Sequence, residues 1–443
     1  MKIIFCLHHF LPEFIGGTEI YTLYLAKQLI LQNEDPVVIV PGFGATETRE
    51  YLYEGVRVIR YAETSHGDRR MILGLKEPEG LNEFVRIIKN EKPDIVHFHE
   101  IAPGSGISIF HVEKVAELDI PIIITFHVPY YSCFRGSLLY KGKEKCDGEI
   151  DIKKCTECIY NLKNITGFKA SVLSGTAMAL FKLNIDATML NTHLGTALGF
   201  PFVIARIKKN LLRLSNYAEK IVVIADWYRL VLERNQVPAD KLVFIKQGLT
   251  NKKIKSNPAP SFSYPLRLVY LGRISSLKGT GILIEALLEL DSEKIYLDIY
   301  GAETEEKFAL DLREKTRHSP NINWKGRISS THVIAVLSQY DLLCLPSAFE
   351  MSPLVIQEAF AAGIPVLASD VHGNAEQIKD GVNGWLFKFN DAEDLCNKLK
   401  LLVADPSLIA NAKKHLPELN TFEKVADDHL KLYDSIIQNY KEH

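Results

Sequence analysis

The sequence predicts an α/β protein with two doubly wound, Rossmann-like domains. The chain has 443 residues, which is more than one hydrophobic core usually covers, so two domains are expected. Up to about residue 130, short runs of valine, isoleucine and leucine alternate with helical patterns. This alternation is typical of a parallel sheet covered on both faces. It begins again near residue 266, which predicts a second sheet and a cleft between the two domains.

The composition is that of an ordinary globular protein and gives no reason to expect a nucleic-acid partner, since the formal net charge is only −2. The apolar start is interrupted at His8 and His9, too soon for a signal-peptide core. The longest charge-free stretch, 187–205, contains Gly195 and Pro201 and makes a poor transmembrane segment. With an odd number of cysteines, seven, a cytoplasmic setting with reduced thiols is expected.

The first domain is expected to occupy residues 1–250. Its predicted strands cover 2–7, 37–40, 56–59, 94–99, 120–127, 220–224 and 241–245. Its predicted helices cover 18–31, 80–91, 105–118 and 227–235. In such sheets ligands gather at the carboxyl ends of the strands. Gly17, His99 and His127 all lie at these ends. His127 could donate a hydrogen bond or titrate near neutral pH, although a lone histidine is more often structural.

An insertion at about 130–215 interrupts this pattern. Its first part contains four cysteines within 26 residues: Cys133, Cys146, Cys155 and Cys158. In a reducing compartment this set favours a structural zinc ion that staples a segment with little core of its own. Free thiols and disulfides are the alternatives.

The second part of the insertion, at about 165–213, is apolar and is predicted to be helical, and it ends in the basic residues Arg206, Lys208, Lys209 and Arg213. The simpler interpretation is a helical pair packed on the domain. The alternative is a platform for a lipid-linked acceptor, with peripheral contact to the inner membrane surface.

The second domain is expected at 266–420, after a linker at 251–265 that is rich in Lys, Ser, Asn and Pro. Strands are predicted at 266–271, 294–300, 322–324, 341–345 and 366–369, with helices at 280–290 and 391–404. The remaining residues, 421–443, are expected to form a helix that returns to the first domain.

One further helix, at 352–362, organises the second domain. Ser352 is a suitable N-cap, Pro353 suits the first helical position, and Gly363 can end the helix. The N–H groups at Leu354 and Val355 would then form an anion site, most obviously for phosphate. Glu350 and Glu358 flank this helix start and could accept hydrogen bonds from sugar and ribose hydroxyls. A capped helix with two solvated glutamates is the alternative.

Two glycine-containing loops complete the candidate site. In the second domain Arg273 and Lys278 lie on the loop after the first strand, where two cations suit a diphosphate. In the first domain Gly16 and Gly17 open a helix. Neither loop matches a Walker loop or the dinucleotide-binding fingerprint. A solvated basic loop and a helix-packing turn are the simpler explanations.

Together these motifs resemble the retaining GT-B nucleotide-sugar glycosyltransferases, a group that includes many bacterial lipopolysaccharide, capsule and mannosyl transferases. The resemblance runs nearly end to end, and its most specific part is the two-glutamate motif combined with the Arg273 and Lys278 loop. The matching segments are Gly16-Gly17, 94–99, 125–127, 271–273, Lys278-Gly279, Pro346-Ser347, Glu350 with Glu358, 363–366 and 380–384.

The resemblance implies transfer of a sugar from a UDP- or GDP-sugar to an acceptor hydroxyl, with retention and with no cofactor required for catalysis. Arg273 and Lys278 would hold the diphosphate, with Ser352, Pro353 and Leu354 at the helix start. Glu350 would bind the donor sugar and Glu358 the ribose. His127 would contact the sugar, and Gly16 and Gly17 would let the first-domain loop approach the diphosphate.

Three positions depart from the family pattern: Val128 where Asp is frequent, Met351 where Gly is frequent, and Gln247 where Asn is usual. A GT-B-fold sugar-nucleotide epimerase and a non-catalytic nucleotide-sugar binding module are the competing functions. The expected acceptor is a growing glycan or a lipid-linked glycan, as in polysaccharide biosynthesis.

Overall fold

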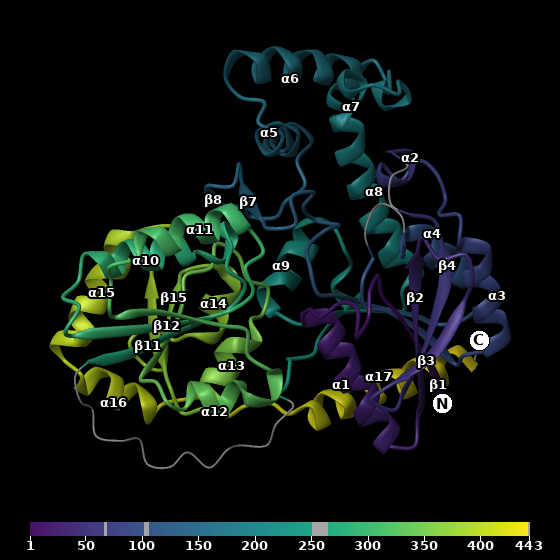
Figure 1. Ribbon diagram of the computed structural model, residues 1–443. Coiled ribbons are helices and arrows are strands. Elements are labelled where there is room, and N and C mark those ends of the chain that lie inside the picture. Colours follow the sequence, from purple (N-terminus) through teal and green to yellow (C-terminus); the bar gives the residue numbers. More distant parts are fainter. Residues whose placement is uncertain (66–68, 102–105, 250–264, 442–443) are drawn as a thin grey trace. The chain divides into compact units, whose positions relative to one another are not determined.

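The computed structural model describes residues 1–65, 69–101, 106–249 and 265–441, and it divides into two compact units (Figure 1). The first unit comprises Met1–Lys246 with Phe422–His443, and the second comprises Gln247–Thr421. The division falls at 246, close to the boundary expected at 250. Apart from Pro265, the linker expected at 251–265 lies outside the described residues.

The first unit contains an eight-stranded sheet in the order β10-β9-β6-β5-β1-β2-β4-β3. Its strands are β1 (Lys2–Cys6), β2 (Asp35–Phe43), β3 (Arg49–Tyr53), β4 (Val56–Glu63), β5 (Ile95–Phe98), β6 (Ile122–Phe126), β9 (Lys220–Val223) and β10 (Leu242–Phe244). All pair in parallel except β3, which runs antiparallel to β4. A two-residue turn at Glu54 and Gly55, both at positive φ, makes this hairpin.

The helices around this sheet include the expected ones and the inserted ones. The former are α1 (Gly17–Leu31), α3 (Leu81–Glu91), α4 (Ile109–Ala116), α9 (Asp226–Arg234) and α17 (Phe422–Lys441), with a short α2 at Arg69–Ile72. The insertion contains β7 (Leu139–Tyr140), β8 (Glu144–Lys145), α5 (Ile152–Leu162), α6 (Gly167–Lys182), α7 (His193–Leu198) and α8 (Phe200–Tyr217). Short 3₁₀ turns lie at Ala187–Met189 and Ala239–Lys241.

The second unit contains a six-stranded parallel sheet in the order β13-β12-β11-β14-β15-β16. Its strands are β11 (Leu266–Leu271), β12 (Ile295–Tyr300), β13 (Ile322–Gly326), β14 (Leu342–Leu345), β15 (Val366–Ser369) and β16 (Gly384–Phe387). Its helices are α10 (Thr280–Leu288), α11 (Glu306–Lys315), α12 (Val333–Leu337), α13 (Leu354–Ala361), α14 (His372–Gln377), α15 (Ala392–Ala404) and α16 (Ser407–Lys413), with 3₁₀ turns at Ser276–Lys278 and Ser330–His332.

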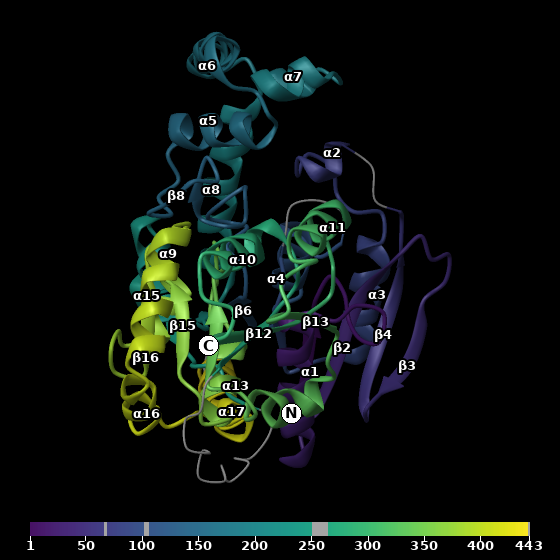
Figure 2. The same cartoon turned by 60° about the vertical axis from the view of Figure 1, so that its left-hand side comes forward.

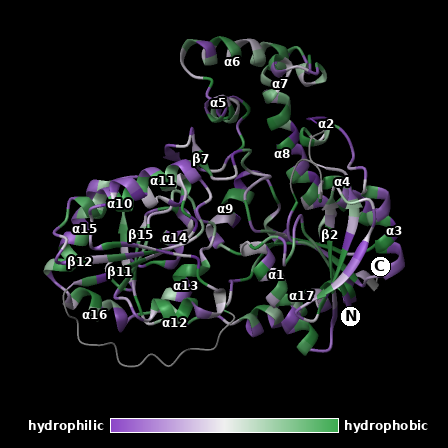
Figure 3. Ribbon diagram, in the orientation of Figure 1, coloured by the Kyte–Doolittle hydropathy of each residue, from purple (hydrophilic) through white to green (hydrophobic). Residues whose placement is uncertain are grey.

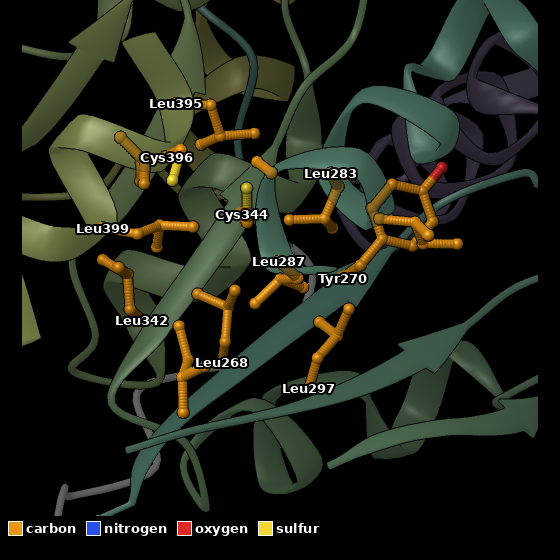
Figure 4. Packing of buried hydrophobic residues seen from close by; sticks show 14 of the residues in the cluster. Leu268, Tyr270, Leu283, Leu287, Leu297, Leu342, Cys344, Leu395, Cys396 and Leu399 are labelled. Carbon is orange, nitrogen blue, oxygen red and sulfur yellow. The ribbon is translucent and has the colours of Figure 1, made fainter. Parts of the chain in front are cut away.

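Helices cover both faces of the second sheet. One buried cluster joins the sheet to α10, α11, α15 and α16, and Figure 4 shows Leu283, Leu287 and Leu399 pointing toward Leu268 and Leu342. A second buried cluster joins the other face to α12 and α13. The continuous apolar strands follow from this double burial, because no face of the sheet is left for polar side chains.

In both sheets the strand order reverses beside the first strand. The reversal lies between β11 and β14 in the second unit, and between β1 and β5 in the first. Doubly wound sheets bind ligands at such points, outside the carboxyl ends of the strands. The loops after β11 and β14 contain the Arg273–Lys278 loop and Glu350, so the fold brings these separate motifs together.

Candidate functional site

The loop after β11 is held by its glycine. Gly279 has φ +72, and a Cβ added there would lie 2.0 Å from the carbonyl oxygen of Pro346. The loop therefore lies directly on the segment that follows β14. A backbone hydrogen bond from Ala348 N–H to Leu277 O, at 2.8 Å, joins the same two segments.

Lys278 and Glu350 meet across this contact. The ammonium of Lys278 lies 2.6 Å from Oε1 of Glu350, and the two side chains are only 19% and 11% exposed. Arg273 on the same loop is exposed. The pair thus combines a cation suited to a diphosphate with a carboxylate suited to hydroxyl groups, both partly shielded from water.

Helix α13 begins one residue later than expected. Pro353, not Ser352, occupies the N-cap position, Leu354 is the first helical residue, and no side chain caps the helix. Proline has no N–H of its own, and the first N–H groups of a helix have no partner within it. The uncapped N–H groups at Leu354 and Val355 therefore remain suited to an anion. Gly363 adopts φ +80 after the last turn, as predicted.

Glu358 lies in the second turn of α13. Burial raises the pKa of its carboxyl group to about 7. Near neutral pH this group is therefore partly protonated, so it can donate as well as accept a hydrogen bond. Such a group suits a ribose hydroxyl better than a phosphate.

A buried polar network that the sequence did not reveal supports the Glu350 segment. The hydroxyl of Ser369 donates to the carbonyl of Ser347, and the amide of Asn374 donates to Ser369 O at 3.0 Å. A Cβ at Gly373 would lie 2.4 Å from the carbonyl oxygen of Glu350. The usable signal in the sequence was the Gly373-Asn374 pair four residues after the predicted strand at 366–369.

In the first unit, His127 follows β6 and is buried. Its Nε2 lies 3.1 Å from Nδ1 of His99, and its ring makes an edge contact with Tyr21. Burial lowers the pKa of His127 to about 3. The expectation that it could titrate near neutral pH is therefore wrong, because a buried imidazolium would lose its hydration. Its remaining capacity is hydrogen bonding as a neutral imidazole.

His97 and His99 lie on the same side of β5, with ring centroids 4.1 Å apart. His97 is fully buried between the hydroxyls of Thr125 and Tyr433, each 2.7 Å away. It is therefore a packing residue that connects the sheet to α17.

Gly17 is the first residue of α1 and Gly16 its N-cap. A Cβ at Gly16 would lie 2.6 Å from Oε2 of Glu19, whereas a Cβ at Gly17 would meet nothing within 4 Å. Burial raises the pKa of Glu19 to about 7. Space at Gly17 and a buried acid beside Gly16 are both consistent with a loop that a ligand approaches closely.

The four clustered cysteines line one pocket between the β7–β8 hairpin and α5. They are Cys133, Cys146, Cys155 and Cys158, and none forms a disulfide. In the described parts of the chain, no three His, Cys, Asp or Glu side chains are arranged to hold a metal ion. The structure thus gathers the thiols around one pocket but does not arrange them as ligands.

Two family models match the chain. Residues 251–417 match "Glycosyl transferases group 1", and residues 15–148 match "Glycosyltransferase Family 4". Among curated proteins, the "Putative colanic acid biosynthesis glycosyltransferase WcaL" of Escherichia coli is 27% identical over 184 residues, which are 40% of this chain and 45% of that protein. The chain thus spans less than half of this relative.

An enzyme of Campylobacter jejuni is 34% identical over 110 residues, covering 24% of this chain and 29% of the enzyme. It is the N,N'-diacetylbacillosaminyl-diphospho-undecaprenol alpha-1,3-N-acetylgalactosaminyltransferase. Among solved structures, Anabaena Alr3699/HepE in complex with UDP and glucose has a TM-score of 0.60 at 14% identity, over 98% of this chain and all of that one. These matches establish the GT-B fold and support a GT-B glycosyltransferase family.

Proposed function

We propose that this chain, whose two domains match glycosyltransferase models, transfers a sugar from a nucleoside-diphosphate sugar to an acceptor hydroxyl with retention of configuration. The observation that carries the proposal is the contact of 2.6 Å between Lys278 and Glu350 at the strand reversal of the second sheet. A phosphate-binding cation and a sugar-binding carboxylate adjoin there.

Each residue has a distinct task in this proposal. Arg273 and Lys278 neutralise the diphosphate, and the first N–H groups of α13 supplement their charge. Glu350 accepts hydrogen bonds from the donor sugar, and Glu358 binds the ribose. His127 acts on the donor sugar as a neutral hydrogen-bonding group. Because the cations supply positive charge, the proposal requires no divalent metal for catalysis.

Retention would follow from a same-face displacement. The bond from the anomeric carbon to the diphosphate oxygen breaks, and a bond to the acceptor oxygen forms on the same face. The acceptor proton passes to the departing diphosphate. Positive charge at Arg273 and Lys278 stabilises that leaving group most strongly in the transition state. Glu350 pairs with Lys278, an arrangement that favours a hydrogen-bonding role for it over a nucleophilic one.

A panel of UDP- and GDP-sugars tests the donor. We expect one of them to raise the thermal midpoint of the protein and to be hydrolysed slowly without acceptor. Product anomers measured by NMR test retention, and an inverted product contradicts it. Isomerisation of the nucleotide sugar without acceptor would instead identify an epimerase. Full activity without added divalent cation is expected, and a requirement for one would contradict the cation roles.

We propose a growing glycan or a lipid-linked glycan as the acceptor. The names of the two curated relatives support this class, since one belongs to colanic acid biosynthesis and the other refers to a diphospho-undecaprenol. Transfer to a short undecaprenyl-diphosphate saccharide, compared with the same saccharide without lipid, is the direct measurement. Equal rates on the two would remove the lipid from the proposal.

We also propose that the clustered cysteines bind a structural zinc ion. They share one pocket, and the N–H of Lys141 donates to Sγ of Cys158 at 3.2 Å. The neighbouring strands β7 and β8 have two residues each, so this segment has little core to hold it. Binding requires the thiols to turn inward to tetrahedral distances.

Metal analysis of the purified protein should find about one zinc per chain. The double variant Cys155→Ser, Cys158→Ser should lose this zinc and unfold at a lower temperature. Cys396→Ser is the matched control, because Cys396 is buried in the second unit and should leave the zinc content unchanged. Metal-free protein of full stability, or disulfides among these cysteines, would contradict the proposal.

A further inference from the structure

Helices α6 and α7 and the segment that joins them expose an unusual concentration of large apolar side chains. Phe168 is 84% exposed, Leu183 69% and Met189 66%. Val172, Ile185, Leu190 and Leu194 are also more than half exposed. These seven residues lie within 27 positions of the chain. Two views show α6 and α7 projecting from the remainder of the first unit (Figures 1 and 2).

The apolar residues of α6 follow a helical spacing. Phe168, Val172 and Ala179 lie on one outward stripe that continues to Leu183, whereas Ser174 and Ala177 face inward and are buried. Residues separated by three or four positions share a helix face. The outward stripe is therefore apolar, whereas the outward face of a helix packed on a domain is usually polar. Figure 3 shows hydrophobic residues along α6 and α7.

The charged residues of α6 and of the turns on either side of it are all basic. Residues 158–185 contain no Asp or Glu, whereas Lys163, Lys169 and Lys182 are exposed among them. Asp186, which follows, pairs with Arg206 at 3.3 Å. The apolar surface is therefore bordered by exposed lysines, which favour an anionic surface.

Two arginines hold α7 and the segment that joins it to α6 against the rest of the first unit. The guanidinium of Arg69 donates to Thr196 Oγ1 at 2.7 Å and to Thr188 O at 3.0 Å. Arg206, besides its pair with Asp186, donates to Leu73 O at 2.8 Å. Arg206 therefore anchors the segment that joins α6 and α7. Arg213 pairs with Glu113 within the same unit.

We propose that the apolar surface of α6 and α7 binds the surface of an anionic lipid bilayer. Contiguous exposed apolar patches on monomers usually serve an interaction, and an apolar stripe bordered by lysines fits the boundary between lipid head groups and acyl chains. The described helices include none long and apolar enough to cross a membrane, so the contact proposed is peripheral. Bilayer binding would bring the protein to a lipid-linked acceptor, and only this purpose of the binding rests on the proposed function.

Vesicle sedimentation tests the proposal with the full chain. We expect binding to vesicles of phosphatidylglycerol and phosphatidylcholine, and weaker binding to phosphatidylcholine alone. The double variant Phe168→Asp, Val172→Asp should weaken binding about tenfold or more. Leu52→Asp is the matched control, because Leu52 is 74% exposed on the distant strand β3 and should bind as the parent does.

Failure of the parent to bind either vesicle, or equal binding by the double variant, overturns the proposal. A concentration-dependent dimer that the double variant abolishes, without vesicle binding, would assign the surface to a second copy of the chain instead. Stabilisation by nucleotide sugar should be unchanged in the double variant. A protein that binds vesicles but no nucleotide would therefore refute the proposed function and leave this inference standing.

Discussion

At the scale of single residues, the contact between Lys278 and Glu350 decides how the site is tested. Lys278→Ala should abolish stabilisation by nucleotide sugar because the diphosphate loses its nearest cation. It should also lower the free energy of unfolding by about 1–3 kcal/mol, because the shielded Glu350 carboxylate loses its partner. Denaturant unfolding with and without ligand measures both effects.

Glu350→Gln is the matched variant for this test. It keeps the shape of the side chain and a hydrogen bond from Lys278 while it removes the charge. We expect little loss of stability and weaker donor-sugar binding. If Lys278→Ala binds the nucleotide sugar as tightly as the parent does, the assignment of the diphosphate to this loop is wrong.

The buried histidines of the first unit predict how stability depends on pH. Burial lowers the pKa values of His97, His99, His127 and His429, so these rings stay neutral in the folded chain. Below a pH of about 6.5 the same rings bind protons in the unfolded chain. The unfolded state then binds more protons than the folded state does, so these histidines lower stability as pH falls from about 6.5 toward 4.

Buried carboxyl groups act in the opposite direction. Glu19 and Glu358 have pKa values raised to about 7 in the folded chain. Their contribution to the free energy of unfolding is therefore complete at low pH and is lost as pH rises from about 4.5 to 7. Single substitutions separate the effect of the histidines from that of the carboxyl groups. His429→Gln should flatten the loss of thermal stability between pH 7 and 5, whereas Glu358→Gln should steepen it. An identical pH profile in His429→Gln would show that this ring is charged in the folded chain.

At the scale of elements, Gly279 controls the placement of the phosphate-binding loop. Gly279→Ala combines positive φ with a Cβ 2.0 Å from the Pro346 carbonyl oxygen. We expect a loss of roughly 2–4 kcal/mol in unfolding free energy and weaker nucleotide binding. Gly326→Ala is the matched control, since Gly326 has φ +75 and open space around it. It should show only the backbone strain of about 1 kcal/mol.

The sequence could predict strands whose signal is a continuous apolar run, because such runs are buried on both faces. Strand β3 was missed, since residues 49–53 alternate exposed and half-buried side chains on an edge. The start of α13 was placed too early because Ser352 and Pro353 permit either start. The pairing of Lys278 with Glu350 could not be foreseen, since it depends on the approach of two loops 72 residues apart.

At the scale of the whole chain, distant segments complete the first unit. Helix α17 follows the entire second unit but packs against α1, and Tyr433 reaches His97 across 336 positions. Tyr433→Phe should cost about 1–3 kcal/mol, because it leaves a buried ring nitrogen without its partner. Tyr440→Phe is the control, since its hydrogen bond to Asp119 is exposed and should contribute about 0.5 kcal/mol or less. Thermal unfolding separates the two, and equal losses would contradict the structural role of Tyr433.

The position of α17 also has a consequence for biosynthesis. Phe422 and Tyr433 are buried against α1 and the first sheet, but the ribosome makes them after the whole second unit. While the about 175 residues of the second unit are translated, the nascent first unit lacks α17. Tyr21 is then not yet covered by Phe422. The second unit can fold during this interval, because its own core lies within one continuous segment. The second unit can therefore complete its fold before α17, which completes the first unit, has been made.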